Sequence, residues 1–134
     1  MRTASRLGVL LLLTFGAVTL VALEGGEVVV LTTRGEDGDR TTRTWVAPAD
    51  GALWIEAAHE GRPFLRDLRR DPAAVLHHDG RSRTCRATVL PPPEGHERIR
   101  ALLRQRYGWR DRWVGLLADT SDSRAIRLDC DGGA

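Results

Sequence analysis

Residues 28 to 55 constrain the fold more than any other part of the chain, because they predict three consecutive β-strands joined by two tight turns. Residues 28 to 33 are rich in β-branched side chains, and residues 40 to 46 (RTTRTWV) alternate arginine with threonine before a tryptophan. Asp50-Gly51 is a hairpin turn signal, and residues 52 to 58 follow it as the third strand. This early succession of hairpins favours an antiparallel sheet.

The remaining residues predict three more strands and three short helices. The further strands are 73 to 78, 81 to 90 and 124 to 130, the first two being separated by Asp79-Gly80. The helices are 63 to 70, 94 to 107 and 109 to 117. The last is amphipathic, and we expect its two tryptophans to lie in the core, the alternative being a ligand cage. Because an open sheet of six strands leaves exposed edges, we predict a mainly β (α+β) fold, a six-stranded antiparallel split β-barrel.

An uncharged segment, residues 7 to 23, precedes the strands and is long enough to cross a bilayer at the short end of the usual range. It is either a membrane anchor or a signal peptide, and the bulky Leu20 at the −3 position of the candidate cleavage site favours the anchor. An apolar helix packed on the domain is the third alternative. We therefore predict an anchor helix within residues 1 to 25 and one barrel domain over residues 27 to 130.

Charges flanking this segment predict its orientation. Arg2 and Arg6 precede it, and Glu24 and Glu27 follow it. Because basic residues stay on the cytoplasmic side, we expect the N-terminus inside and the domain outside the cytoplasm. There Cys85 and Cys130 can form a disulfide, whereas in the cytoplasm we expect them to be buried thiols.

Composition excludes two classes of function. The net charge is only +2, with both signs mixed along the chain, so there is no basic stripe for nucleic acid. The cysteine spacing suits no zinc site, and the adjacent His77 and His78 point to opposite faces of one strand, so we predict no metal.

The clearest candidate site surrounds the turn at residues 35 to 38. Its glycines leave backbone N–H groups free for an anion, and a phosphate cradle can be completed by the side chains of Thr32, Thr33, Arg40, Thr41 and Thr42. An ordinary hairpin with solvated arginines is the alternative. The helix at 63 to 70 predicts a charged face of Arg62, Arg66 and Arg69 or Arg70, with Asp67 among them in the sequence. This face is either solvated or the second half of the anion site.

The chain resembles, over about residues 27 to 129, the flavin- and deazaflavin-dependent nitroreductase and quinone-reductase family. The similarity lies in the order LTTRG, RTTRTWV, ALWIEAA, a helix ending in LRRDP, and the hairpin AAVLHHDGRSRTCRATVL. The resemblance implies a split β-barrel related to pyridoxamine phosphate oxidases. It also implies a coenzyme, FMN or a deazaflavin, in a groove between barrel and helix, often at a homodimer interface.

Residue by residue, the resemblance assigns Arg40, Thr41 and Thr42 to the coenzyme phosphate, while Thr32 and Thr33 match the first family motif and are also predicted to bind the cofactor. It places the helix that contains Arg66 and Asp67 along the groove. Separately, we expect Trp45 or Tyr107 to shape the substrate pocket. The implied function is a membrane-anchored oxidoreductase that reduces a small lipophilic acceptor such as a quinone.

The turn departs from the family pattern, because Glu36, Asp37 and Asp39 make it acidic. Repulsion of about 1 to 4 kcal/mol per charge pair at about 4 Å disfavours a strongly anionic deazaflavin. Two other functions are consistent with the sequence. One is a non-catalytic split barrel that has lost its coenzyme and holds haem, a lipophilic molecule or nothing. The other is a membrane-tethered interaction module that uses its arginine-rich helix.

Overall fold

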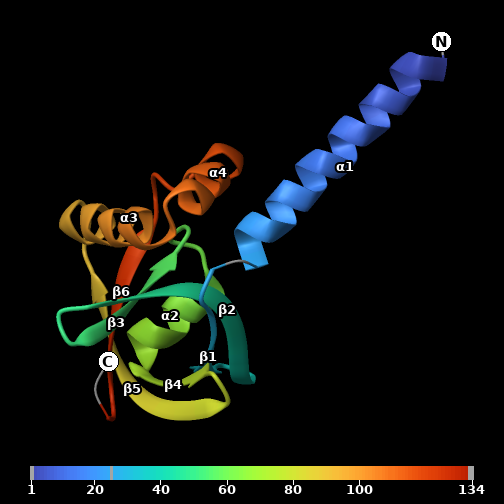
Figure 1. The fold of residues 1–134 in the computed structure, drawn as a ribbon. Helices are drawn as coiled ribbons and strands as arrows, with labels where there is room; N and C mark the ends of the chain where they lie inside the picture. Colours follow the sequence, from blue (N-terminus) through green and yellow to red (C-terminus); the bar gives the residue numbers. More distant parts are fainter. Residues whose placement is uncertain (1, 25, 133–134) are drawn as a thin grey trace.

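The computed structural model describes residues 2–24 and 26–132, which form a closed antiparallel barrel, three short helices and one long helix (Figure 1). The strand order around the barrel is β1-β2-β3-β6-β5-β4. The strands are β1 (Val28–Gly35), β2 (Gly38–Ala49), β3 (Ala52–Ala57), β4 (Ala73–His78), β5 (Arg81–Leu90) and β6 (Arg124–Cys130). The predicted fold class, a six-stranded antiparallel barrel with short helices, is confirmed.

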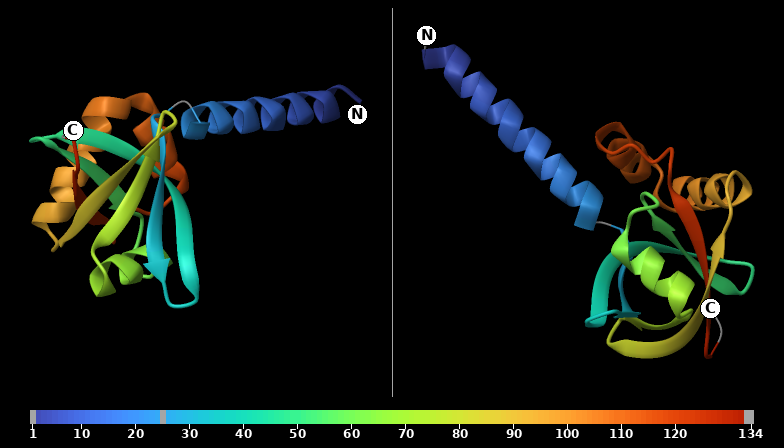
Figure 2. Two further views of the ribbon diagram at one scale, coloured as in Figure 1. Left: turned by 90° about the horizontal axis from the view of Figure 1, so that it is seen from below. Right: turned by 180° about the vertical axis from the view of Figure 1, so that it is seen from behind.

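The helices take different positions around this barrel. They are α1 (Arg2–Glu24), α2 (Pro63–Arg70), α3 (Glu94–Tyr107) and α4 (Trp109–Leu117). In the view of Figure 1, α2 closes one end of the barrel, while α3 and α4 lie at one side and α1 projects away. The two further views in Figure 2 show the same arrangement, with α1 joined to the barrel only near its C-terminal end.

Strand alternation divides the buried side chains into two clusters. The inner face of the barrel, with Leu31, Ile55 and Leu128, packs around Phe64 and Leu65 of α2. A second cluster lies outside the barrel, where α3 covers the outer face of β2, β3 and β6; it contains Ala47, Trp54, Ile99, Leu102, Leu103, Tyr107 and Ala125. Each cluster removes several large side chains from water, which is the main driving force for this fold.

In the described part of the chain, no helix covers the outer face of β1 and β4, or the parts of β2 and β5 that lie away from α3. Side chains on this face are mostly polar or partly exposed, as Thr32, Arg34 and Thr41 illustrate. A row of registered residues crosses it from Thr41 through Thr32 and Val75 to Thr84. This face is therefore open to a ligand or to another chain.

Cys85 and Cys130 face each other in register on β5 and β6 and form a disulfide. The bond links two strands that are 45 residues apart in the sequence. Of the two alternatives that the sequence left open, the structure has the paired one. Structural disulfides form and persist mainly in proteins of oxidising compartments.

The prediction that the tryptophans of α4 lie in the core is wrong for Trp109, whereas Trp113 is partly buried. Trp109 is 50% exposed, Leu116 81% and Leu117 51%, whereas Asp111 is only 3% exposed. Arg100 of α3 holds the Asp111 carboxylate with two hydrogen bonds of 2.6 and 2.7 Å and also contacts Glu56 of β3. This ionic contact turns the polar face of α4 inward, so that its apolar stripe faces outward.

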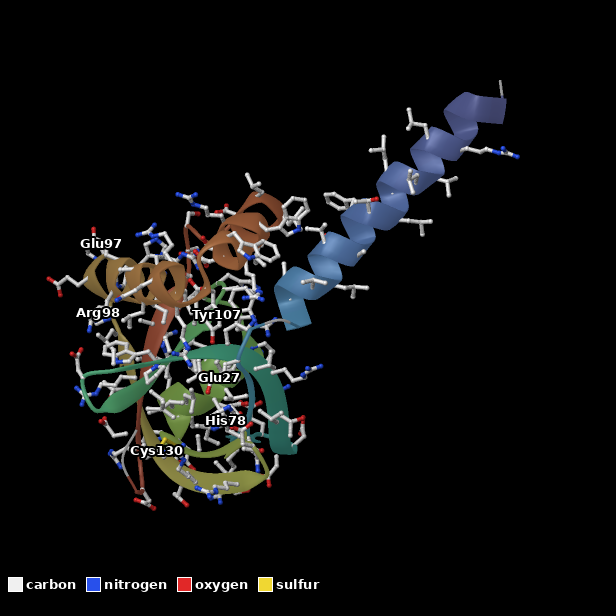
Figure 3. The ribbon with its side chains drawn as sticks, in the orientation of Figure 1. Glu27, His78, Glu97, Arg98, Tyr107 and Cys130 are labelled. Atoms are coloured by element: carbon white, nitrogen blue, oxygen red, sulfur yellow. A yellow bond between two sulfur atoms is a disulfide. The ribbon has the colours of Figure 1, made fainter. Side chains whose placement is uncertain are left out.

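One helix of the described chain is long and apolar enough to span a membrane, over residues Arg6–Leu23. Its leucines and valines are exposed along almost its whole length, and apart from the contacts of its C-terminal half with α4 and the barrel, its side chains in Figure 3 project away from the domain. Exposure of this kind is unfavourable in water. It weakens the alternative of an apolar helix packed on the domain.

Candidate functional site

The site predicted from the sequence begins at the turn that joins β1 to β2. Glu36 and Asp37 form a two-residue turn between Gly35 and Gly38, which pair with each other. A Cβ atom on Gly35 would come within 2.7 Å of the Gly38 carbonyl oxygen, so the close approach of the strands requires glycine there. The same register places Arg40 of β2 opposite Thr33 of β1.

Asp67 of α2 connects this turn to the end of the barrel. Its Oδ2 accepts hydrogen bonds from Thr33 Oγ1 at 3.1 Å and from Arg40 Nε at 2.8 Å. Both Asp67 and Thr33 are buried, and Phe64, Leu65 and Leu68 of α2 anchor the helix in the barrel core. Three of the predicted site residues, from three different elements, are thus in direct contact.

Arg40 and Asp67 line a hollow of about 230 Å³, here called the end hollow. Its other lining residues are Glu36, Asp37, Arg66 and Arg70. Arg70 donates to Glu36 at 2.9 Å and to the Arg34 carbonyl at 3.0 Å. The three arginines balance the three carboxylates. Of the three arginines, only Arg66 has no hydrogen-bond or ion-pair partner among the described residues, so one guanidinium is available for an external anion.

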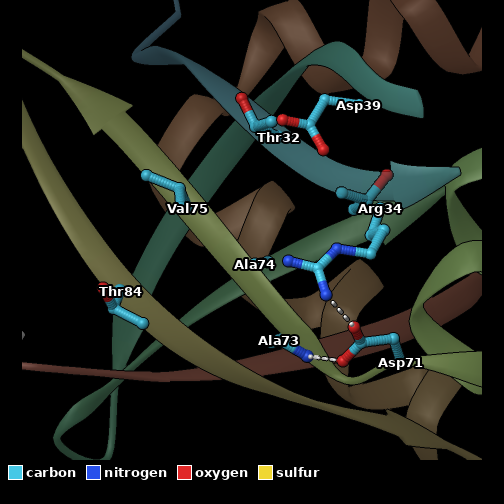
Figure 4. A pocket seen from close by; sticks show the side chains of 9 residues that line it. Thr32, Arg34, Asp39, Asp71, Ala73, Ala74, Val75 and Thr84 are labelled. Carbon is cyan, nitrogen blue, oxygen red and sulfur yellow. Dashed lines mark hydrogen bonds and ion pairs between the residues drawn. The ribbon is translucent and has the colours of Figure 1, made fainter.

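A second hollow, of about 250 Å³, lies on the uncovered outer face and is here called the outer hollow (Figure 4). Its lining residues are Thr32, Thr33, Arg34, Asp39, Asp71, Ala73, Ala74, Val75 and Thr84. Arg34 approaches Asp71 at 3.7 Å, and Asp71 Oδ1 accepts a hydrogen bond of 3.0 Å from the Ala73 backbone. The outer hollow therefore combines an apolar surface of alanine and valine with three threonines, one guanidinium and the carboxylates of Asp39 and Asp71.

Strand alternation distributes the predicted cradle between the two faces of the barrel wall. Thr33 and Arg40 are paired on the inner face, as are Leu31 and Thr42, whereas Thr32 and Thr41 are paired on the outer face. The five side chains predicted for one phosphate cannot all reach the same group. The sequence did not assign Arg34 or Asp39 to a ligand, although strand alternation on either side of the turn places both on the outer face with Thr32 and Thr41.

Trp45 and Tyr107, predicted beside the substrate, lie together near the other end of β1. Their ring centroids are 4.7 Å apart. The Tyr107 hydroxyl donates to the Val46 carbonyl at 2.6 Å, and burial raises the pKa of this phenol. Trp45 Nε1 donates to the Leu23 carbonyl at the end of α1 (3.2 Å), so this indole connects the long helix to the barrel.

Trp45 also lines a hollow of about 290 Å³ that we call the junction hollow, because it lies where α1 meets the barrel. The other lining residues are Leu23, Arg43, Thr44, Glu56, Ala58, Arg62, Leu103 and Val114. Figure 3 shows Tyr107 close to Glu27, whose carboxylate pairs with Arg106 and, at 3.0 Å, with His78. Tyr107 is buried in the wall beside this hollow rather than exposed in it.

No group of three or more His, Cys, Asp or Glu side chains suited to a metal ion occurs within the described residues. The end hollow and the outer hollow are lined by guanidinium, carboxylate and hydroxyl groups, which are suited to binding and orienting a ligand. Two serine hydroxyls contact histidines at 2.8 Å, Ser82 with His77 and Ser123 with His96, and neither pair lines these two hollows.

Comparisons with known proteins establish the fold. No profile of a known protein family matches the sequence, and a search of curated proteins finds no similar sequence. Among solved structures, a Listeria innocua protein assigned as a pyridoxamine 5'-phosphate oxidase has a TM-score of 0.59 at 17% identity, with 86% of this chain and 92% of that chain covered. The fold is therefore the split barrel of pyridoxamine phosphate oxidase-like proteins.

Two further structures with this fold carry other descriptions. An F420 reductase has a TM-score of 0.53 at 17% identity over 80% of this chain and 88% of its own. The heme storage protein HutZ of Vibrio cholerae has a TM-score of 0.60 at 15% identity over 88% of this chain and 90% of its own. At these sequence identities the similarity shows a shared fold. It does not indicate which of the described functions, oxidase, reductase or heme storage, this chain has.

Proposed function

We propose that this chain is a membrane-anchored oxidoreductase of the nitroreductase and quinone-reductase type. In this proposal it binds FMN or a deazaflavin at the β1–β2 end of the barrel and reduces a small lipophilic acceptor such as a quinone. The observation that carries the proposal is the convergence of Arg40, Arg66 and Asp67 on one hollow, where Thr33 of β1 supports the Asp67 carboxylate with a hydrogen bond. An F420 reductase and a protein assigned as a pyridoxamine 5'-phosphate oxidase have the same fold and add support.

The charges of the end hollow fit a ligand with one phosphate better than a ligand with several anionic groups. Arg66 supplies the available guanidinium, while Arg40 and Arg70 are held by Asp67 and Glu36. Bidentate contact between a guanidinium and a phosphate is strong, but each extra negative charge would meet Glu36 and Asp37. FMN therefore fits this chain better than a polyanionic deazaflavin.

When bound, the coenzyme supplies the hydride or electrons, and the residues of this chain hold and orient it. Thr32 and Thr41, on the outer face, are placed to contact a ligand in or beside the outer hollow. Because that face is uncovered, it is also where a second copy would complete a homodimer. The acid or base for the reaction is not among the residues that we assign.

The junction hollow is the proposed entry point for the acceptor. It lies between the barrel and Leu23, the last residue of the apolar segment, so a lipid-dissolved molecule would reach it without crossing water. From Thr33 to Val28 the β1 strand spans about 16 Å. The coenzyme ring must therefore extend along the barrel, away from the phosphate contacts, to reach an acceptor beside Trp45.

Titration of the full chain with FMN in mild detergent tests the proposal. We expect saturable quenching of flavin fluorescence, and about tenfold weaker binding for Arg66→Gln because it removes a charge-assisted contact. Arg104→Gln is the matched control, since Arg104 is an exposed arginine of α3 without a partner in the described structure. A colourless protein that binds neither FMN nor a deazaflavin would contradict the enzyme proposal.

A non-catalytic barrel that holds haem or another lipophilic molecule is the second candidate. The balanced charges of the end hollow favour it, and the heme storage protein shares the fold. An absorbance spectrum of protein from its native host distinguishes the two, because haem and flavin absorb differently. The interaction-module alternative has less support, because Arg69 and Arg70 are already engaged by Glu60 and Glu36.

A further inference from the structure

The apolar stripe of α4 faces outward, away from the barrel core. Apolar side chains of a short helix normally pack against the core, so we expect this stripe to be covered by a binding partner. Trp109, Leu116 and Leu117 are all at least half exposed. Together with Trp113 they fall within about 100° of the helix circumference, at i, i+4, i+7 and i+8. The opposite side carries Asp111, which is fixed to Arg100. The stripe is therefore held outward by a buried ionic contact.

The position of α4 beside α1 identifies the partner. Trp113 Nε1 donates to Thr19 Oγ1 at 3.1 Å, and the Trp113 ring lies 5.5 Å from that of Phe15. Figures 1 and 2 show α4 next to the C-terminal half of α1. Both contact residues of α1 are inside the apolar segment Arg6–Leu23.

The depth of these contacts follows from helix geometry. Thr19 and Phe15 are four and eight residues before Leu23, which corresponds to about 6 and 12 Å along the axis at 1.5 Å per residue. A membrane that covers α1 as far as Leu23 must therefore also reach α4. Tryptophan is enriched at this level of a bilayer, where its ring is partly apolar and its N–H is polar.

Charges beside the stripe are suited to lipid headgroups. Arg112 is exposed on α4 and Arg104 on α3, and neither has a partner among the residues that the structure describes. Arg110 lies over the Trp109 ring at 5.3 Å. Basic residues next to an apolar stripe are typical of helices that lie in the membrane surface and attract anionic lipids.

We propose that α4 docks on the membrane as an interfacial helix, with Trp109, Leu116 and Leu117 inserted among the lipids beside α1. The barrel then has two attachments to the bilayer, which fix its orientation and hold the junction hollow, lined by Leu23 and Val114, at the membrane surface. The inference rests on the membrane anchor of the proposed function. It does not depend on which cofactor is bound.

Tryptophan fluorescence of the full chain in vesicles tests this docking. The chain is reconstituted in phosphatidylcholine and phosphatidylglycerol, with brominated acyl chains as the lipid-side quencher and acrylamide as the water-side quencher. We expect brominated lipid to quench the wild type, and Trp109→Phe to remove a large part of that quenching. Trp54→Phe is the control, because Trp54 is buried under α3.

A second variant tests the leucines without changing any fluorophore. Leu116→Gln with Leu117→Gln is expected to reduce quenching by brominated lipid and to increase quenching by acrylamide. Both leucines are exposed, so the change leaves the fold intact, and Ala101→Gln on the exposed side of α3 is the matched control. Unchanged quenching in the double variant would contradict the docking.

Flotation of the vesicles tests membrane anchoring by α1 separately from the docking of α4. A chain that does not float with lipid contradicts both the anchor and the docking. A chain that floats while Trp109 is quenched by acrylamide and not by lipid contradicts the docking alone. A Trp109 that neither quencher reaches is covered by protein, either a second copy or another partner, and this also overturns the inference.

Discussion

Asp67 is the residue on which the predicted site depends most. Its buried carboxylate accepts hydrogen bonds from Thr33 and Arg40 and so joins β1, β2 and α2. Asp67→Asn keeps the size of the side chain but removes the charge that opposes Arg40. We expect a loss of about 1 to 3 kcal/mol in the free energy of unfolding. Urea unfolding in mild detergent, followed by tryptophan fluorescence, measures it.

The control for this prediction is Asp39→Asn, in the strand that follows the same turn. Asp39 is exposed and has no hydrogen-bond or ion-pair partner among the described residues. An exposed residue of this kind changes stability by less than about 0.5 kcal/mol. Equal effects of the two substitutions would show that Asp67 does not organise the site.

Tyr107 gives a prediction about pH. Burial raises its pKa above the ordinary value of about 10, while Arg106 acts in the opposite direction. The unfolded chain therefore loses this proton first. The contribution to stability is complete below about pH 10 and is lost as the pH rises through the pKa of the folded state.

We expect the free energy of unfolding to fall above about pH 10, and Tyr107→Phe to flatten that fall. Because the chain has a single tyrosine, the absorbance of tyrosinate reports on this group alone. A titration at the ordinary tyrosine pKa in the folded protein would contradict the prediction.

At the scale of helices and strands, most of the fold is predictable from the sequence. The dipeptides Asp50-Gly51 and Asp79-Gly80 mark two hairpins that the structure contains, and both aspartates have positive φ. The predicted ranges of β4, β5, β6 and the three short helices match the structure. Local turn chemistry and periodicity determine these elements, so no knowledge of distant contacts is needed.

The direction in which α4 faces is not predictable in the same way. Its periodicity is that of an amphipathic helix, but periodicity does not say which side meets the barrel. Arg100, eleven residues before Asp111, decides this through a buried ionic contact. The contacts of the candidate site are also not predictable from local sequence. Asp67 accepts a hydrogen bond from Thr33, which is 34 residues away in the chain, and no local pattern indicates this contact.

The disulfide supports a prediction about the pairing of β5 and β6. Removing it with Cys85→Ser and Cys130→Ser frees a loop of 45 residues in the unfolded chain. We expect a loss of about 2 to 4 kcal/mol in the free energy of unfolding. Urea unfolding with and without reductant measures this loss, and the reduced wild type is expected to match the double variant. Wild-type stability that reductant leaves unchanged would mean that the thiols are not paired.

At the scale of the whole molecule, two distant features point to the same compartment. The segment Arg6–Leu23 is suited to a membrane, and Arg2 and Arg6 favour an N-terminus on the cytoplasmic side. The Cys85–Cys130 disulfide is typical of a domain outside the cytoplasm. Arg34 and the later arginines belong to a long domain, whose charge has little influence on orientation.

These features predict that the barrel is translocated. An alkaline phosphatase reporter, which needs an oxidising compartment to fold, is expected to be active when fused to the C-terminus and expressed in a bacterium. A β-galactosidase fusion at the same point is expected to be inactive. Arg2→Gln and Arg6→Gln combined with Glu24→Arg reverse the charge bias, so we expect this variant to lose much of the phosphatase activity.

The control for the fusion experiment is the variant Arg104→Gln with Arg112→Gln, which removes two arginines from the domain instead of from the N-terminus. We expect this variant to keep the wild-type membrane orientation. The disulfide provides an independent check, because a translocated barrel is oxidised and a cytoplasmic barrel is kept reduced. An active β-galactosidase fusion together with free thiols would place the barrel in the cytoplasm and overturn the predicted orientation. The α4 stripe would still face the membrane in that case, because its position is set by contact with α1.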